Sequence, residues 1–368
     1  MSGKRLVPIS TVTAPVPGVR DGRLATVSVI IPCYNYGHFL PDSVPSVLSQ
    51  HGVEVEVVIV DDRSTDDSAE VAQRYADADP RVRLVRHEVN QGHVAAFNSG
   101  LAVATGEFIV RLDADDLLTP GSLVRAVALF DAHPSVGLVY GHPHHFTTDR
   151  PPAAQTEMRG WTVWSGRDWI AERCRRGINC ITTPEAIVRG SVVERIGPLS
   201  PRLEFAQDME YWLRVAAVSD VGRIDGADQA LHRDHAASMS VTTGSGLMLD
   251  LRERRTVFDV LFDGPGGDLP DAAELHDLSR RTLAAEALQD ASHAYDRGHT
   301  GEVDVDAFVD FALETFPQAR TLPQWRALQR RRMVGARVAP LMPTFAASVV
   351  WRRAQREVRE RRWVRAGI

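Results

Sequence analysis

The 368-residue sequence has few cysteines and no long apolar run. Its three cysteines (Cys33, Cys174 and Cys180) form no Cys-x-x-Cys pair, which excludes a disulfide scaffold and favours a reduced, cytoplasmic protein. No stretch reaches the roughly 18 apolar residues of a membrane-spanning helix. The first residues lack the apolar core of about 7–15 residues found in secretory signals, so we expect none.

Several motifs of nucleotide enzymes are also missing. No Gly-x-Gly-x-x-Gly follows the first predicted strand and no Gly-Lys-Ser/Thr loop occurs, which argues against a dehydrogenase and a P-loop enzyme. The tripeptide His232-Arg233-Asp234 matches part of a protein-kinase catalytic loop. That interpretation fails because Met239 stands where the kinase loop needs asparagine.

Positive charge is not in excess over the whole chain, whose net charge is −6, so we predict no nucleic-acid partner. The charge is uneven, because residues 326–368 hold 12 Arg and 2 Glu, or +10, which leaves −16 for residues 1–325. Two interpretations of this basic tail stay open. It makes peripheral contact with an anionic membrane, or it forms a solvated helix that packs against the acidic body.

The dominant positive signal is an alternation of apolar strands and helices. Runs rich in β-branched residues predict strands, and helical spacing between them predicts helices. The predicted strands are 27–33, 54–62, 81–85, 107–113 and 136–140, and the predicted helices are 38–50, 66–78, 93–104 and 120–132. This order predicts an α/β fold with a mostly parallel central sheet flanked by helices.

The two ends of the chain differ from this region. Residues 1–25 contain three prolines and no clear period, and we predict a flexible leader. Strand-and-turn patterns end near residue 245. Residues 246–368 then form a predicted helical C-terminal region with its basic tail, whose helices cover 247–262, 272–297 and 305–316.

Acidic side chains follow two predicted strands where they end. Asp61 and Asp62 close the second strand, and Asp113, Asp115 and Asp116 follow the fourth. Because ligands of open α/β sheets bind beyond the carboxyl ends of the strands, we expect these groups in one crevice. Carboxylates held that close repel one another unless a cation lies among them, and Mn²⁺ or Mg²⁺ suits such oxygens together with a diphosphate.

Four sequence blocks resemble those of family 2 glycosyltransferases, in the same order and at similar separations. They are residues 27–35, 60–66, 90–98 and 106–116. The resemblance covers about residues 26–242. It implies the GT-A nucleotide-diphospho-sugar transferase fold for residues 26–245, followed by the helical extension.

The resemblance also implies roles for single residues of a nucleotide-sugar site. Pro32, Tyr34 and Asn35 would line the base pocket. Asp62 would contact the uracil or ribose, and Asp113 would lie near the ribose.

The same resemblance implies further nucleotide-sugar-binding residues and the metal ligands. Asn90 and Gly92 belong to the block after the third strand, where glycine lets the backbone approach the ligand. Asp115 would ligate the metal with Asp116 as support, and His235 would ligate the metal or donate to phosphate.

Asp208 matches the general base that would take a proton from the acceptor hydroxyl. Gln207 stands where the family usually has glutamate, which removes one charge beside the base. Arg233 would contact the diphosphate, and His232 replaces a frequent tyrosine and is given no role.

Residues 141–205 should form the acceptor side. Trp161, Trp164 and Trp169 favour a core position over sugar stacking, and the histidines of 142–145 favour a turn over a metal cluster. A glycan, a lipid-linked or a small-molecule hydroxyl acceptor fits equally well.

The sequence therefore predicts an inverting, metal-dependent glycosyltransferase with a nucleotide-sugar donor, UDP-linked by resemblance. It would be cytoplasmic, with peripheral membrane contact if the tail binds lipid. Two alternatives stay open: a non-catalytic GT-A scaffold that binds nucleotide-sugar or glycan, and a nucleotidyltransferase with the same sheet layout, which would release pyrophosphate.

Overall fold

The computed structural model describes residues 6–12, 23–203, 205–235 and 246–345, and residues 352, 354, 357, 358, 361, 363 and 367. Most of the predicted leader, and most of the tail after residue 345, lie outside the described residues. The chain divides into two compact units. The first comprises Met1–Ile170 and Ile181–Thr242, and the second comprises Ala171–Cys180 and Thr243–Ile368.

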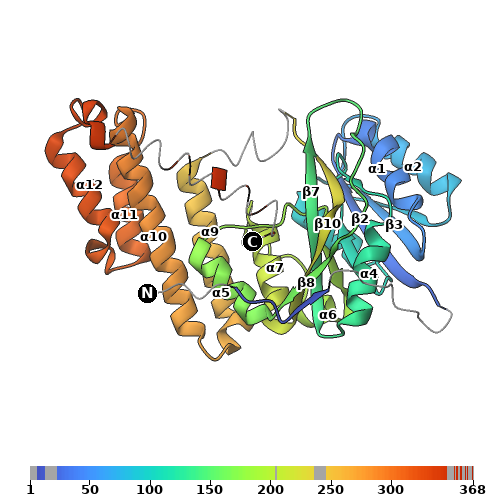
Figure 1. Cartoon of the computed structure of the whole chain (residues 1–368). Coiled ribbons are helices and arrows are strands. Elements are labelled where there is room, and N and C mark those ends of the chain that lie inside the picture. Colours follow the sequence, from blue (N-terminus) through green and yellow to red (C-terminus); the bar gives the residue numbers. More distant parts are fainter. Residues whose placement is uncertain are drawn as a thin grey trace. The chain divides into compact units, whose positions relative to one another are not determined.

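The first unit is built on one mixed sheet (Figure 1) with the strand order β1-β8-β10-β7-β9-β5-β2-β3-β4, and β6 pairs with β10. The strands are β1 Ser10–Val12, β2 Ala25–Cys33, β3 Val53–Asp61, β4 Val82–Arg86, β5 Phe108–Arg111, β6 Leu117–Leu118, β7 Val136–Phe146, β8 Gly160–Trp164, β9 Ile187–Arg189 and β10 Asp220–Arg233. Strands β5, β2, β3 and β4 are parallel, as are β7 and β10. The short β9 joins these two parallel blocks and is antiparallel to both β5 and β7. The predicted α/β class is confirmed.

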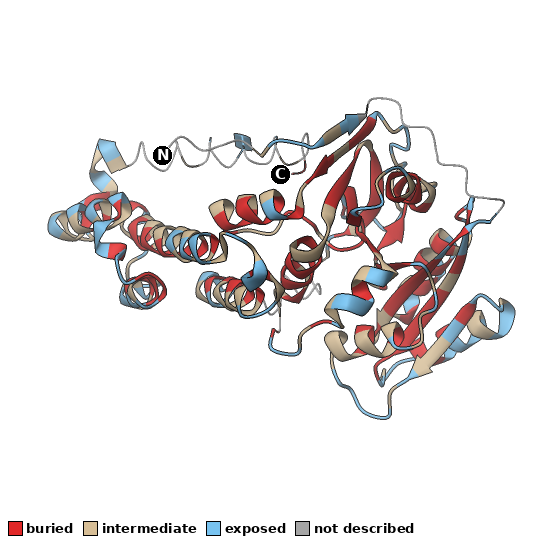
Figure 2. Cartoon of the chain, turned by 90° about the horizontal axis from the view of Figure 1, so that it is seen from below, coloured by how far each residue is buried: buried red, intermediate tan, exposed pale blue. Residues whose placement is uncertain are grey.

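Helices cover both faces of the parallel block. The helices of this unit are α1 Leu40–Leu48, α2 Ser68–Ala78, α3 His93–Leu101, α4 Ser122–Ala132, α6 Gly190–Ile196 and α7 Gln207–Val218, and α5 Gly166–Arg176 leads into the second unit. On β2, Val29 and Ile31 belong to the core cluster that also includes Leu40 of α1. Ile30 lies under Gly100 of α3 on the opposite face, because neighbouring side chains of a strand alternate. Figure 2 shows most of these strand residues as buried, which explains their continuous apolar sequence.

Three local expectations are corrected by the structure. The helix predicted over 38–50 begins as the 3₁₀ turn η1, Gly37–Phe39. The helix α1 then starts at Leu40, with Pro41 in its first turn, where proline is well tolerated. Ser10–Val12, inside the predicted leader, form β1 and pair with β8. The predicted turn over 142–145 is wrong, because pairing with β10 carries β7 on to Phe146.

The tryptophans of the first unit are core residues, as predicted. Trp161, Trp164 and Trp169 are each buried, and Trp169 contacts Tyr140 of β7 edge to face. All three cysteines of the chain are buried.

The second unit is helical. Its helices are α9 Leu247–Asp263, α10 Ala272–Arg297, α11 Val305–Thr315 and α12 Pro323–Val334, with 3₁₀ turns η2 Pro265–Asp268, η3 Ala319–Thr321 and η4 Ala339–Leu341. The buried carboxylate of Asp296 on α10 accepts hydrogen bonds from both Arg331 and Arg352. Among the described helices, none is both long and apolar enough to cross a bilayer.

Candidate active site

The loop that follows β5 carries three acidic residues in four positions. Asp113 pairs with Arg111 at the end of β5, with 3.0 Å between Nη2 and Oδ1. Burial by itself would raise the pKa of Asp113, but Arg111, His93 and His232 together outweigh it and lower that pKa. Asp113 therefore stays ionised at the rim of the sheet.

Asp115 faces His235, with 2.8 Å between its Oδ2 and the imidazole Nε2. Burial and the neighbouring charge of Asp113 raise the pKa of Asp115, so a second positive group here would be favourable. The Tyr36 ring lies 5.7 Å from the His235 ring and closes one side of this pair. A carboxylate and an imidazole this close, beside a second carboxylate, fit a divalent cation.

Asp116 is completely buried and anchors the end of β10. It accepts a hydrogen bond from His232 Nδ1 at 3.0 Å and another from the Arg233 backbone N–H at 2.9 Å. Burial raises the pKa of Asp116 to about 7. Burial opposes the charged form of His232, but the Asp116 carboxylate outweighs it and raises the pKa of His232 to about 9.

The Arg233 guanidinium is held by protein groups. Its Nε donates to the Asp115 carbonyl at 3.1 Å and its Nη2 to Asp42 Oδ2 at 3.0 Å. The guanidinium carbon lies 5.0 Å from the Phe39 ring and 4.7 Å from the Phe146 ring. Arg233 thus fixes the backbone of the acidic loop, and its contact with a diphosphate stays a prediction.

The residues predicted to line the base pocket lie at the carboxyl end of β2. Pro32 is half-buried, Tyr34 is 45% exposed and Asn90 of the neighbouring loop is exposed. The Asn35 Oδ1 accepts a hydrogen bond from the Thr65 backbone N–H at 2.8 Å. Asn35 adopts a left-handed conformation, which asparagine tolerates better than most residues.

Asp62 holds the loop after β4 in place. It accepts hydrogen bonds from the backbone N–H groups of Gln91 at 2.9 Å and Gly92 at 2.7 Å. Its Oδ1 also lies 2.7 Å from His87 Nδ1, and His87 Nε2 lies 2.8 Å from Ser99 Oγ on α3. His87 does not stand out in the sequence, since its sequence neighbours carry no motif.

Asp208 lies in the first turn of α7 and accepts a hydrogen bond from the Met209 backbone N–H at 2.7 Å. It opens onto a small pocket lined mainly by apolar side chains: Phe97, Ile109, Arg111, Val188, Leu199, Tyr211 and Trp212. Burial raises the pKa of Asp208 to about 6, with Arg111 acting against this rise and Asp113 adding to it. Such a pKa suits a carboxylate that accepts a proton near neutral pH.

The neighbouring Gln207 makes a direct side-chain contact. Its Nε2 lies 2.7 Å from Nε2 of His93, the first residue of α3 and the neighbour of Gly92. The residue that departs from the family pattern therefore ties α7 to the loop held by Asp62. Neither His93 nor Arg111 stood out in the sequence.

Comparison with known proteins shows which family the chain resembles. Residues 28–196 match the family model described as "Glycosyl transferase family 2". An "Uncharacterized glycosyltransferase alr2836" of Nostoc sp. is 42% identical over 188 residues, 48% of this chain and 54% of that protein. "Glycosyltransferase GlyG" of Streptococcus pneumoniae is 35% identical over 119 residues, 32% of this chain and 40% of that protein. The chain spans about half, or less, of the length of these relatives.

Two solved structures share the fold. S. aureus TarS 1–349 in complex with UDP-GlcNAc aligns with a TM-score of 0.57 at 18% identity, over 86% of this chain and 89% of that chain. The mannosyltransferase PcManGT from Pyrobaculum calidifontis, in complex with GDP-Man and Mn²⁺, aligns with a TM-score of 0.51 at 23% identity, over 90% of each chain. The predicted GT-A fold is confirmed.

Proposed function

Since residues 28–196 match the model of glycosyl transferase family 2, we propose that the chain is an inverting, metal-dependent glycosyltransferase that moves a sugar from a UDP-linked donor to a hydroxyl acceptor. The observation that carries this proposal is the set of acidic groups around β5 and α7. Asp113 and Asp208 interact electrostatically with the same residue, Arg111, and Asp115 and Asp116 follow on the adjoining loop. A UDP donor is supported by the likeness to TarS, solved with UDP-GlcNAc.

In this proposal the donor nucleotide lies beyond the ends of β2, β3 and β5. Pro32, Tyr34 and Asn35 line its base pocket and Asp62 holds Gly92, whose backbone faces the ligand. An added Cβ at Gly92 would meet no atom of the described residues within 4 Å, so this side of the loop is open. Asn90 borders the same site, and Asp113 contacts the ribose.

Asp115 and His235 would hold Mn²⁺ or Mg²⁺. Their fit rests on the raised pKa of Asp115 and on the 2.8 Å between the carboxylate and the imidazole. When bound, the cation neutralises charge on the leaving diphosphate. Arg233 orients Asp115 by binding its carbonyl and adds positive charge on that side.

Asp208 acts as the general base. Inverting transfer is a direct displacement, in which the acceptor oxygen bonds to the anomeric carbon as the bond to the diphosphate breaks. The acceptor hydroxyl loses its proton to the Asp208 carboxylate during this step. The apolar pocket beside Asp208 keeps water from competing with the acceptor.

We also propose the organisation of the chain as a leader over 1–25, a GT-A domain over 26–245 and a helical region over 246–368. The buried, free thiols of Cys33 and Cys174 support work in the reducing cytoplasm. Exposed apolar residues on α12 and η4 support peripheral contact with an anionic membrane, which would suit a lipid-linked acceptor.

A donor panel with Mn²⁺ tests the proposal. UDP- and GDP-sugars are incubated with the chain, and free nucleoside diphosphate is measured by chromatography. We expect release from a UDP-sugar, lost in Asp208→Asn while calorimetry still detects donor binding. Release of pyrophosphate would point to a nucleotidyltransferase instead, and binding with no turnover of any donor would favour the scaffold.

A further inference from the structure

The ends of β7 and β10 bring together histidines that are far apart in the sequence. These strands are parallel, and their register pairs His145 with His232 and His142 with Asp228. Residues opposite each other on paired strands point to the same face. The His145 and His232 rings accordingly pack edge to face, with centroids 4.8 Å apart.

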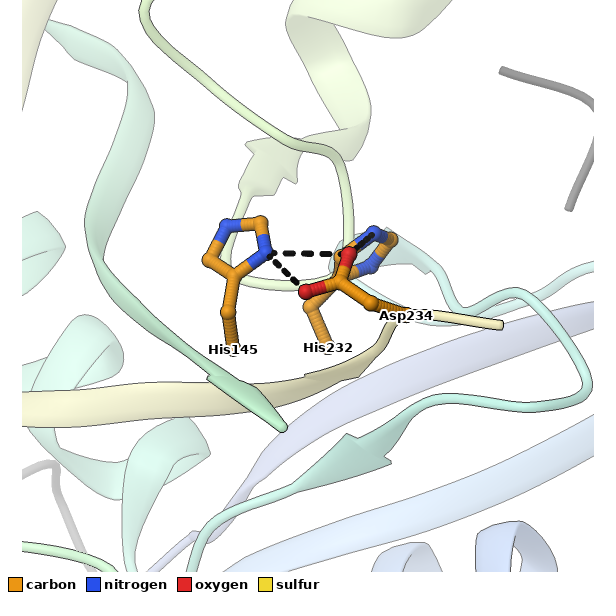
Figure 3. Close-up of side chains that lie close together, drawn as sticks. All are labelled: His145, His232 and Asp234. Atoms are coloured by element: carbon orange, nitrogen blue, oxygen red, sulfur yellow. Dashed lines mark hydrogen bonds and ion pairs between the residues drawn. The ribbon is translucent and has the colours of Figure 1, made fainter. Parts of the chain in front are cut away.

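Asp234 completes a group of three side chains (Figure 3). Its carboxylate lies between the two imidazoles, with 3.2 Å from Oδ2 to His145 Nδ1 and 3.7 Å from Oδ1 to His232 Nε2. One ligand atom from each residue can be chosen so that all lie within 4.8 Å of one another. Ligands of tetrahedral zinc, with bonds of about 2.1 Å, lie about 3.4 Å apart, so small side-chain rotations would suffice.

A second layer of contacts orients His232. The buried Asp116 carboxylate binds His232 Nδ1, and this leaves Nε2 as the nitrogen turned toward Asp234. A carboxylate on the far nitrogen of a metal-binding histidine is the usual support of such ligands. The outer side is open, because the side chains of His145 and Asp234 are 41% and 48% exposed.

We propose that His145, His232 and Asp234 form a second metal site, which binds Zn²⁺ or a similar transition-metal ion without nucleotide. Two imidazoles and one carboxylate favour Zn²⁺, Co²⁺ or Ni²⁺ over Mg²⁺ and Mn²⁺. The site shares no ligand with the pair proposed for the donor cation, Asp115 and His235. Asp116 connects the two sites, because it follows Asp115 in the sequence and binds His232. An ion here would therefore stabilise the same end of β10.

Cobalt binding tests this site directly. The chelator-treated full-length chain is titrated with Co²⁺ at about pH 8, and visible absorption and calorimetry are recorded. At this pH the ion has to displace the proton that the Asp116 carboxylate favours on His232, so binding should release a proton. We expect one ion bound without nucleotide, displaced by Zn²⁺ but not by excess Mg²⁺. His145→Ala should weaken binding at least about tenfold, because loss even of a supporting residue weakens metal sites by that much. Asp234→Asn should weaken binding as well.

Two matched variants distinguish this site from others. His299→Ala removes a half-exposed histidine that faces Glu302 in the second unit, and it should bind Co²⁺ as the parent does. Asp115→Asn should also retain nucleotide-free binding. The proposal is overturned if no Co²⁺ binds, if His145→Ala binds it equally well, or if Asp115→Asn alone abolishes binding. Because no donor is present, failure of this test would leave the proposed transferase activity unaffected.

Discussion

At the scale of single residues, the pKa of Asp208 sets the expected pH dependence of transfer. Burial raises this pKa to about 6, so the base becomes protonated and inactive as the pH falls through that value. We expect kcat to fall about tenfold per pH unit below 6, whereas an ordinary carboxylate would remain active down to about 4. Measuring kcat against pH at saturating donor tests this, and a profile flat to about pH 4 would contradict it.

Asp62 is expected to affect stability and donor binding mainly through the loop after β4, which it holds in place. Asp62→Asn weakens the bonds to the Gln91 and Gly92 N–H groups and to His87, so we expect a loss of about 1–3 kcal/mol in the free energy of unfolding, with weaker donor binding. Urea denaturation and calorimetry measure the two effects. The control Asp67→Asn changes an exposed side chain that makes no capping bond, and should stay within about 0.5 kcal/mol.

At the scale of elements, the fit of α3 on the sheet depends on Gly100. A Cβ at this position would collide with the Ile30 Cγ2 of β2 and lie 3.0 Å from the Val60 Cγ2 of β3. Gly100→Ala should therefore destabilise the chain by about 1–3 kcal/mol, despite the better helix propensity of alanine. Gly301→Ala, where the added Cβ has no neighbour within 4 Å, should leave the urea midpoint unchanged. Equal midpoints for both variants would refute tight α3 packing.

At the scale of the whole molecule, charge and exposed apolar surface coincide near the C-terminus. Met333, Val338 and Leu341 are exposed, and the surrounding residues 326–368 carry +10. We expect Met333→Gln with Leu341→Gln to reduce partition onto phosphatidylserine vesicles. Replacing the exposed arginines 326, 330 and 337 by glutamine should reduce it up to about 100-fold.

Contacts within the second unit determine which variants suit the vesicle-binding test. Deleting residues 326–368 would remove both arginines that bind the buried Asp296 carboxylate and so destabilise α10. Point substitutions avoid that loss. Leu247→Gln alters another exposed apolar residue, on α9, and serves as the control. Equal partition of all variants would favour the alternative, a basic segment that packs against protein.

Much of the secondary structure of the first unit could be predicted, because the sequence patterns that specify it span only a few neighbouring residues. Apolar runs and acidic residues at strand ends follow from neighbouring positions, and the predicted strand starting at Val136 and helix starting at His93 begin as expected. The acidic positions 113, 115 and 116 likewise follow from one continuous block.

Other features depend on contacts between distant segments. The antiparallel β9, the partners of Asp62 and the anchoring of Arg233 each join residues that no local pattern relates. The histidines of 142–145 resembled a turn by composition, yet pairing with β10 extends β7 through them and sets His145 beside His232. Composition and periodicity specify which elements form, because they act over a few residues. Strand register and packing specify which side chains meet, because they act across the whole sheet.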